Sequence, residues 1–212
     1  MKNIAVVPVK GLTNGKRRLS GHLNHDERRR LVLAMLQDVL LALDRSSLFE
    51  EVLVISPDGA VGENQLHHAS FIQQNGVGLN AGVRQATQLA MEKRAESLSI
   101  VLADIPLIEA MDLKELFQIG REKSRVVLSP SLKGGTNVMI RAPPDAINPS
   151  YGRWSYTKHL RAAQKQALAV YSVSNPRLSF DIDSVEDLRA LRRLDFAGKT
   201  NASQAARQMP HL

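Results

Sequence analysis

The sequence predicts a single α/β domain of three layers (α/β/α), with helices on both faces of a mixed but mainly parallel sheet. Short apolar segments of strand length alternate with longer amphipathic segments of helix length along nearly the whole chain, without internal repeats or a linker. The 212 residues are enough for one domain with a substantial core. Between residues 130 and 182 we expect an antiparallel or mixed portion of the sheet.

In the first half of the chain, apolar runs that end in turns predict the strands Lys2–Val9, Glu51–Ser56, Phe71–Gln74 and a run that begins at Ser99. A long helix is predicted after Asn24, which can act as its cap, with Glu27 at the capping-box position. Another helix begins near Asn80, whose side chain either caps it or contacts a ligand.

In the second half, the same reasoning predicts a helix over Met111–Glu122 and another that opens within Tyr151–Tyr156 and runs to about Gln166. It also predicts strands over Arg125–Ser129, Val138–Ile140, Ala167–Val173 and Leu178–Asp183, and a last helix capped by Ser184. The predicted domain covers residues 1–195. From Phe196 onward the residues are small and polar, which predicts a loosely attached tail over residues 196–212.

The central apolar run delivers one carboxylate, Asp104, to the point where its strand should end. Pro106 removes a backbone donor and favours an extended Ile105, so the strand cannot simply continue. A charge at the carboxyl edge of a buried strand is costly unless a ligand needs it, and ligands of open α/β sheets bind at that edge. A carboxylate that only caps the next helix is the alternative.

A basic, glycine-containing loop follows the first strand. It holds Lys10, Gly11, Gly15, Lys16, Arg17 and Arg18. Glycine lets backbone amides approach a phosphate, and Lys and Arg neutralise its charge, so the loop is suited to holding phosphates. It is neither a Walker A sequence nor a GxGxxG motif, and a merely solvated basic loop remains the alternative.

Two further carboxylates, Asp181 and Asp183, stand two positions apart and would point to the same face of an extended segment. Neighbouring like charges repel unless a cation lies between them. Together with Asp104 they form an all-oxygen set of hard ligands suited to Mg²⁺. The sequence therefore predicts a magnesium site made from residues far apart in the chain.

Two other segments could bind an anion. The turn Lys133–Asn137 offers two glycines followed by the hydroxyl of Thr136, although a plain hairpin would look the same. Ser155 lies near the start of a helix, where free N–H groups favour negative charge.

The composition restricts the classes of function. A formal net charge of +7 suits an anionic partner such as a nucleotide, a phosphorylated metabolite or nucleic acid. The absence of cysteine excludes disulfides and thiol nucleophiles, and no plausible Ser–His–Asp set is present. Without an apolar run of membrane-spanning length or a signal-peptide pattern, we expect a cytoplasmic protein that does not bind a membrane.

Taken together, the motifs VPVK…GKRRLS, LADIPL, GGTN, YGxxS and FDIDSVEDL, in this order over about residues 1–195, resemble the 2-phospho-L-lactate guanylyltransferases of deazaflavin coenzyme F-420 biosynthesis. The resemblance implies a glycosyltransferase-A-like nucleotidyltransferase fold. It also implies Mg²⁺-dependent transfer of GMP from GTP to 2-phospho-L-lactate, or to phosphoenolpyruvate in some relatives, with release of pyrophosphate. A homodimer is a further expectation from the relatives.

The resemblance also implies roles for single residues. Lys10, Gly11, Lys16 and Arg18 would meet the GTP phosphates, Asn80 would lie near the nucleoside, and Asp104, with Lys16, would take part in catalysis. Asp104 with one or both of Asp181 and Asp183 would hold the metal, and the acceptor would be held by Thr136, Gly152 and Ser155. This chain departs from the pattern in the bulky Arg153 and Trp154, where relatives tend to carry smaller residues.

Other classes remain as alternatives. A molybdopterin or sugar-1-phosphate nucleotidyltransferase would carry a longer N-terminal GxGTR-type signature, which is missing, and a glycosyltransferase would usually place its aspartate pair mid-chain. A basic RNA-binding protein would explain the charge. It would also need exposed aromatic residues among its Lys and Arg, and aromatic residues make up only 4 % of the chain.

Overall fold

The computed structural model describes residues 2–12, 15–120, 123–195 and 197–209. In this part of the chain the strands are β1 Asn3–Pro8, β2 Glu51–Ser56, β3 Ser70–Gln73, β4 Ser97–Val101, β5 Arg125–Pro130, β6 Thr136–Ala142 and β7 Ala169–Ser172. The helices are α1 His25–Ser46, α2 Leu79–Glu92, α3 Ala110–Gln118, α4 Ser155–Lys165, α5 Pro176–Ser179, α6 Val185–Leu194 and α7 Asn201–Arg207, with short 3₁₀ turns at Arg17–Leu19 and Gly59–Val61.

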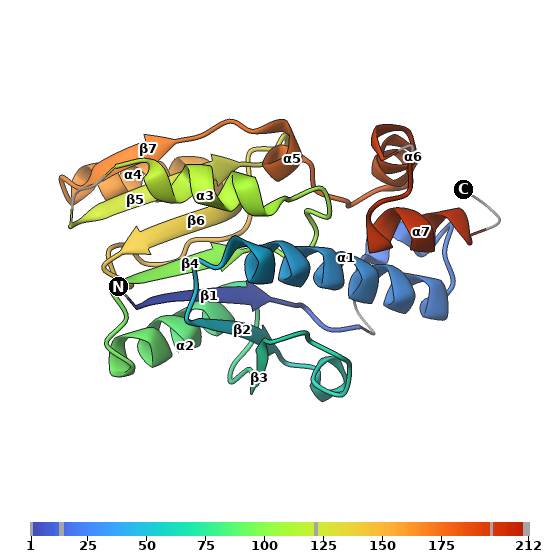
Figure 1. Ribbon diagram of the computed structural model, residues 1–212, viewed down its shortest axis with the longest axis horizontal. Helices are drawn as coiled ribbons and strands as arrows, with labels where there is room; N and C mark the ends of the chain where they lie inside the picture. The colour runs from blue at the N-terminus through green and yellow to red at the C-terminus, as the bar shows by residue number, and fades with distance from the viewer. Residues whose placement is uncertain (1, 13–14, 121–122, 196, 210–212) are drawn as a thin grey trace.

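The described strands form one sheet in the order β3-β2-β1-β4-β6-β5-β7 (Figure 1). All neighbouring strands are parallel except β6, which runs antiparallel to both β4 and β5. The mainly parallel sheet and its mixed portion after residue 130 are therefore confirmed. Because β6 is reversed, its first residue lies at the same edge as the last residues of β1, β2 and β4.

Two separate apolar clusters cover the two faces of this sheet. One includes α1, α3, α6 and α7, and the other includes α2 and α4, so the predicted three layers are confirmed. The strands between them are buried on both faces, as in β4, where every residue is buried. No helix in the described part of the chain is both long enough and apolar enough to cross a bilayer.

Local sequence signals set several helix ends. The Asn24 side chain accepts from Glu27 N–H and the Glu27 carboxylate accepts from Asn24 N–H, which confirms the predicted capping box of α1. Ser184 and Asp187 form the same arrangement at α6. Helix α3 ends at Gln118, where Ile119 turns extended and Gly120 takes a φ of +69°, while the predicted end at Glu122 lies outside the described residues.

Two expectations are wrong. Residues 178–183 do not form a strand, because Leu178 and Ser179 belong to α5 and no described strand pairs with the segment. Hydrogen bonds still tie it to the sheet and its flanking residues: Asn137 Nδ2–H donates to Leu178 O, Leu132 N–H donates to Ser179 O at 3.1 Å, and Ile182 N–H donates to Asp104 O at 3.0 Å. Its side chains still alternate, with Phe180 and Ile182 buried in the core.

The segment after Phe196 is not loosely attached in its described part. Helix α7 packs on α1, and Ala202 and Ala206 are fully buried between them (Figure 1). Asp38 of α1 accepts hydrogen bonds from the backbone N–H groups of Asn201 and Ala202 and from the Asn201 amide, at 2.7–2.8 Å. The small residues thus permit close helix packing instead of weakening it.

Replacing Asp38 by alanine should lower the free energy of unfolding by about 1–3 kcal/mol, because the N–H donors at the start of α7 lose their acceptor. Urea denaturation measures this change. Asp44→Ala, on the same helix with a more exposed side chain, is the matched control and should change stability by less than about 0.5 kcal/mol. Equal effects of the two substitutions would contradict the role of Asp38.

Candidate active site

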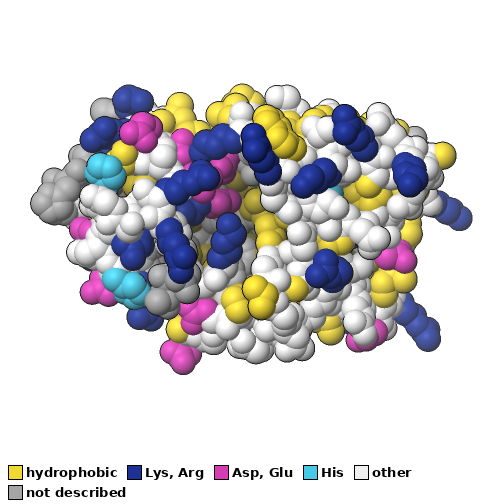
Figure 2. Space-filling view, turned by 180° about the vertical axis from the view of Figure 1, so that it is seen from behind, with side chains coloured by type: hydrophobic (Ala, Val, Ile, Leu, Met, Phe, Trp, Pro, Cys, Tyr) yellow, Lys and Arg dark blue, Asp and Glu magenta, His cyan; other side chains and the backbone are white. Residues whose placement is uncertain are grey.

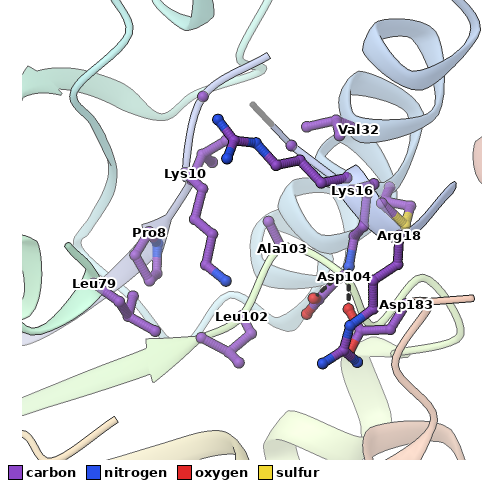
Figure 3. Close-up of a pocket in the computed structure, with 15 residues that line it drawn as sticks. Pro8, Lys10, Lys16, Arg18, Val32, Leu79, Leu102, Ala103, Asp104 and Asp183 are labelled. Atoms are coloured by element: carbon purple, nitrogen blue, oxygen red, sulfur yellow. Dashed lines mark hydrogen bonds and ion pairs between the residues drawn. The ribbon is translucent and has the colours of Figure 1, made fainter. Parts of the chain in front are cut away.

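A cavity of about 370 Å³ opens at the carboxyl edge of β1 and β4. Its walls come from the loop after β1, the interior of α1, the start of α2, the residues after β4 and the segment before α6. Polar and charged lining residues include Lys10, Gly11, Lys16, Arg17, Arg18, Asp104 and Asp183. The structure therefore brings together the predicted phosphate loop and two of the three predicted metal ligands (Figure 3).

The loop after β1 is held in shape by Asp58, which follows β2. Asp58 Oδ2 accepts from Leu12 N–H at 2.8 Å, and a Cβ on Gly11 would lie 3.0 Å from Asp58 Cβ. Gly11 has a φ of +107°, so this approach requires glycine. Asp58 belongs to the turn that ends the second strand, and its contact with a loop 46 residues earlier was not predicted from the sequence.

Lys16 lies at the centre of the charged groups. Its ammonium donates to Asp104 Oδ2 at 2.7 Å and to Asp183 Oδ1 at 3.0 Å (Figure 3). Burial disfavours the charge on Lys16, but the two carboxylates outweigh this effect and raise the pKa of Lys16 above 10.5. The ammonium thus lies where the sequence predicts a metal ion.

A second ammonium, that of Lys133, approaches the same carboxylates from the turn between β5 and β6. It donates to Asp187 at 2.8 Å and lies 3.6 Å from Asp181 and 3.9 Å from Asp183. Although burial acts to raise it, Lys16 and Lys133 keep the pKa of Asp183 below its usual range. Lys133 belongs to the quoted GGTN turn, but its position in the sequence does not reveal this contact.

Two carboxylate oxygens of the predicted metal ligands have no hydrogen-bond partner in the part of the chain that the structure describes, which bears on whether a metal ion would fit there. Within the described residues, Asp104 Oδ1 and Asp181 Oδ1 are buried and have no hydrogen-bond partner. Burial raises the pKa of Asp181, and the charges of Asp104 and Asp183 add to the rise while Lys133 opposes it. Buried, partnerless carboxylate oxygens with mutual repulsion are a donor set that fits a hard divalent cation.

The side chains are not, however, arranged around an ion as they stand. In the described part of the chain, no group of three or more His, Asp or Glu side chains is placed to enclose a metal. Lys16 holds Asp104 and Asp183 together in the place of such an ion. The magnesium site therefore stays a prediction, supported by the donor atoms.

Asn80 bridges the start of α2 and the loop before α4. Its Nδ2–H donates to Tyr151 O at 3.1 Å and its Oδ1 accepts from Tyr151 N–H at 2.7 Å, so the amide forms a two-bond bridge to the loop before α4. Its neighbour Leu79 lines the cavity instead. These contacts show Asn80 holding the loop before α4, and its place near a nucleoside stays a prediction.

A second cavity of about 370 Å³ adjoins the first and shares with it Pro8, Val9, Lys10, Arg17 and Leu79. Its other walls are Pro57, Gln74, Val77 and Gly78, which sequence reasoning did not single out. The Gln74 amide donates to Gly76 O and Gly78 O and so fixes this loop at 3.0–3.1 Å. The side-by-side cavities can take an extended ligand with a charged part and an apolar part.

The predicted acceptor residues form a separate group at the start of α4. Ser155 N–H donates to Gly152 O at 3.1 Å, and a Cβ on Gly135 would lie 3.9 Å from Ser155 Oγ, so Ser155 faces the turn that precedes Thr136. The turn that carries Gly135 also carries Lys133. It therefore connects this group to the carboxylates.

Basic side chains dominate the surface around this region. Figure 2 shows Lys and Arg side chains gathered around a hollowed area that has acidic side chains at its edge. Such a surface attracts a polyanion to a site that contains fixed carboxylates. The surface is therefore suited to a negatively charged ligand.

Comparison with solved structures places this fold. A Desulfovibrio desulfuricans protein described as a nucleotide-diphospho-sugar transferase superposes on this chain with a TM-score of 0.80 and 20 % sequence identity. The superposition covers 98 % of this chain and 95 % of that protein. A nucleotidyl transferase from Methanothermobacter matches 92 % of this chain and 98 % of its own with a TM-score of 0.67, at 15 % identity. The chain thus has the nucleotidyltransferase fold, as predicted.

Sequence comparison identifies one family within the nucleotidyltransferases. Residues 3–202 match the profile of the family described as guanylyl transferase CofC like. The phosphoenolpyruvate guanylyltransferase of Sphaerobacter thermophilus is 38 % identical, covering 90 % of this chain and 93 % of that relative. The 2-phospho-L-lactate guanylyltransferase of Methanocaldococcus jannaschii is 31 % identical, over 89 % of this chain and 81 % of that relative. The chain belongs to this guanylyltransferase family, so it is an enzyme, which removes the RNA-binding alternative.

The pKa of His159, in α4, gives a pH prediction. Burial, with smaller contributions from Arg141 and Lys158, lowers it from 6.5 to about 4. Between about pH 6.5 and 4, His159 is therefore protonated in the unfolded chain and neutral in the folded one. The free energy of unfolding should fall by up to about 3 kcal/mol as the pH drops through this range.

Urea denaturation between about pH 4.5 and 7.5 measures this slope in the protein and in His159→Asn, which should lack it. Burial raises the pKa of Asp38 to about 6, an effect of opposite sign that both proteins share, so the difference between them isolates His159. Identical pH profiles for the two proteins would contradict the assignment.

Proposed function

We propose that this enzyme transfers GMP from GTP to phosphoenolpyruvate or 2-phospho-L-lactate, releases pyrophosphate, and acts in the synthesis of a deazaflavin coenzyme. The observation that carries the proposal is the cavity that combines Lys10, Lys16 and Arg18 with Asp104 and Asp183 at one edge of a nucleotidyltransferase sheet. The relatives named for phosphoenolpyruvate are 35–40 % identical and those named for 2-phospho-L-lactate 31–34 %, which favours phosphoenolpyruvate.

In this reaction an oxygen of the acceptor phosphate attacks the α-phosphorus of GTP, and the bond from that phosphorus to the bridging oxygen of the β-phosphate breaks. The acceptor is already an anion, so the enzyme needs no nucleophile of its own, which agrees with the absence of cysteine. The protein's task is to place two polyanions in line and to neutralise the charge that develops.

Lys16 is suited to this neutralisation. Its ammonium already bridges two carboxylates, its side chain is 10 % exposed, and the cavity beside it is also lined by Lys10 and Arg18. Lys10 is exposed and Arg18 is 78 % exposed, so both can reach a phosphate without leaving a buried partner unpaired. We assign the triphosphate to this cavity and the nucleoside to the adjoining one around Gln74 and Gly78.

Mg²⁺ would be held by Asp104 and Asp181, whose buried oxygens lack partners, with Asp183 as a further ligand. When bound, such an ion polarises phosphoryl oxygens and offsets their negative charge. Thr136, Gly152 and Ser155 would hold the phosphate and carboxylate of the acceptor with hydroxyl and backbone N–H donors. A cytoplasmic homodimer completes the proposal, and light scattering of the purified protein tests the dimer.

The deciding experiment is a screen of pyrophosphate release with each of the four nucleoside triphosphates against phosphoenolpyruvate, 2-phospho-L-lactate and phosphoglycerate, with and without Mg²⁺. Release with GTP and phosphoenolpyruvate, or with GTP and 2-phospho-L-lactate, that requires Mg²⁺ is the expected result. Release that prefers another nucleotide, or none with either acceptor, would overturn the proposal.

Asp104→Asn should lower the rate of GMP transfer at least about 100-fold, because an amide is a poorer ligand for Mg²⁺ and a weaker partner for Lys16. The protein should keep its fold, as judged by thermal unfolding. Asp26→Asn, an aspartate with an 87 % exposed side chain, is the matched control and should retain full activity. An active Asp104→Asn enzyme would remove Asp104 from the metal site.

Ser155→Ala should raise the KM for the acceptor roughly 10- to 100-fold, since a hydrogen bond to a charged group is lost, and should leave the KM for GTP within about twofold. Steady-state kinetics with each substrate varied in turn measures both constants. Ser150→Ala, on the same loop, keeps the backbone contact of residue 150 and should change neither. Equal changes in the two constants would contradict an acceptor role.

A further inference from the structure

His159 connects two segments of the proposed acceptor site, the start of β6 and the loop before α4. It lies in α4 and is fully buried, and none of the motifs that carry the resemblance includes it. Its Nδ1 lies 3.0 Å from Thr136 Oγ1, at the start of β6, and its Nε2 accepts from Ser150 N–H at 2.9 Å. One imidazole ring therefore joins the strand that carries Thr136 to the loop that leads to Gly152.

The bond to Ser150 fixes the protonation of the ring. A backbone N–H can only donate, so Nε2 must carry a lone pair and cannot carry a proton. A neutral imidazole then has its proton on Nδ1, and this proton is donated to Thr136 Oγ1. The tautomer follows from the two contacts together.

This tautomer determines what the Thr136 hydroxyl can do. Because Oγ1 accepts from His159, its own hydrogen is free to be donated, and no other hydrogen bond of this hydroxyl occurs among the described residues. A hydroxyl that must donate suits an oxyanion, such as a phosphate or carboxylate oxygen. A hydroxyl that could also accept would discriminate less well against neutral ligands.

The surroundings keep the ring in this state. Burial disfavours an imidazolium, and the nearby cations Arg141 and Lys158 disfavour it further. Tyr151 packs edge-on against the ring, with centroids 4.9 Å apart, and its backbone is held in turn by Asn80. The ring is therefore fixed in position as well as in protonation.

We infer that His159 is a positioning residue for the acceptor: by donating to Thr136 it turns that hydroxyl into an obligate donor to an acceptor oxyanion, and by accepting from Ser150 it holds the loop of Gly152 against the same site. This inference rests on the proposed function. It adds a residue that does not touch the substrate and a reason why the site takes an anion.

Two substitutions separate the two bonds of the ring. His159→Asn places an amide nitrogen near the position of Nδ1 and can still donate to Thr136, whereas His159→Gln places its amide near Nε2 and can still accept from Ser150. With GTP and phosphoenolpyruvate (or 2-phospho-L-lactate, if the screen selects it), we expect His159→Gln to raise the acceptor KM about 10-fold or more. His159→Asn, which loses only the bond that holds the loop of Gly152, should raise it by a clearly smaller factor, and the KM for GTP should change in neither.

A double substitution tests whether His159 acts through Thr136. Thr136→Val should raise the acceptor KM about as much as His159→Gln, and adding His159→Gln to Thr136→Val should raise it no further. Thr136→Ser, which keeps the hydroxyl, should behave as the unchanged enzyme. Binding of phosphoenolpyruvate, followed by the fluorescence of the single tryptophan, Trp154, gives the same comparison without turnover.

The outcomes are distinct. Equal losses in the KM for GTP and for the acceptor, or full additivity in the double variant, would reduce His159 to a structural residue and overturn the inference. If His159→Gln does not fold, an unchanged acceptor KM in Thr136→Val would overturn it equally. An unsubstituted enzyme that is inactive with either acceptor overturns the proposed function and this inference together, whereas an active one with unaffected variants overturns only the inference.

Discussion

The ammonium of Lys16 between Asp104 and Asp183 is the interaction on which the rest of the site depends. It joins the loop after β1 to the end of β4 and to the segment before α6. In sequence, Lys16 is 88 residues from Asp104 and 167 residues from Asp183. A buried pair of this kind is stable only when each charge has its partner, so loss of one partner leaves a costly charge behind. The fold on either side serves to bring these three segments to one edge of the sheet.

Most of the fold could be predicted because its signals are local. Capping boxes, apolar runs and the proline after Asp104 lie within a few residues of the elements they define, and the structure has these elements close to the expected positions. Asp104 and Asp183 do lie together as expected, but not because carboxyl ends of parallel strands meet at one edge, since Asp183 does not end a strand. In contrast, the 178–183 segment alternates like a strand but has no strand beside it, and alternation alone carries no information about neighbours.

The partners of the site residues could not be predicted, because each contact joins distant parts of the chain. Nothing near Asn80 indicates that its amide is used by Tyr151, and nothing near His159 points to Thr136. Lys16 was expected to meet phosphate, and its bond to two carboxylates emerges only in three dimensions. The attachment of α7 through Asp38 is of the same kind, since small residues are compatible with a loose segment and with close packing alike.

The proposed nucleotide-binding residues lie before the reversed strand β6 in the sequence, and the proposed acceptor-binding residues lie within it or after it. All lining residues of the two adjoining cavities except Asp183 come before residue 105, whereas Thr136, Gly152 and Ser155 all follow the reversal. In the proposed reaction, donor recognition and acceptor recognition are thus encoded in separate stretches of sequence that meet at a shared pair of carboxylates. Substitutions after residue 130 can therefore retune the choice of acceptor while the machinery for the nucleotide is inherited unchanged.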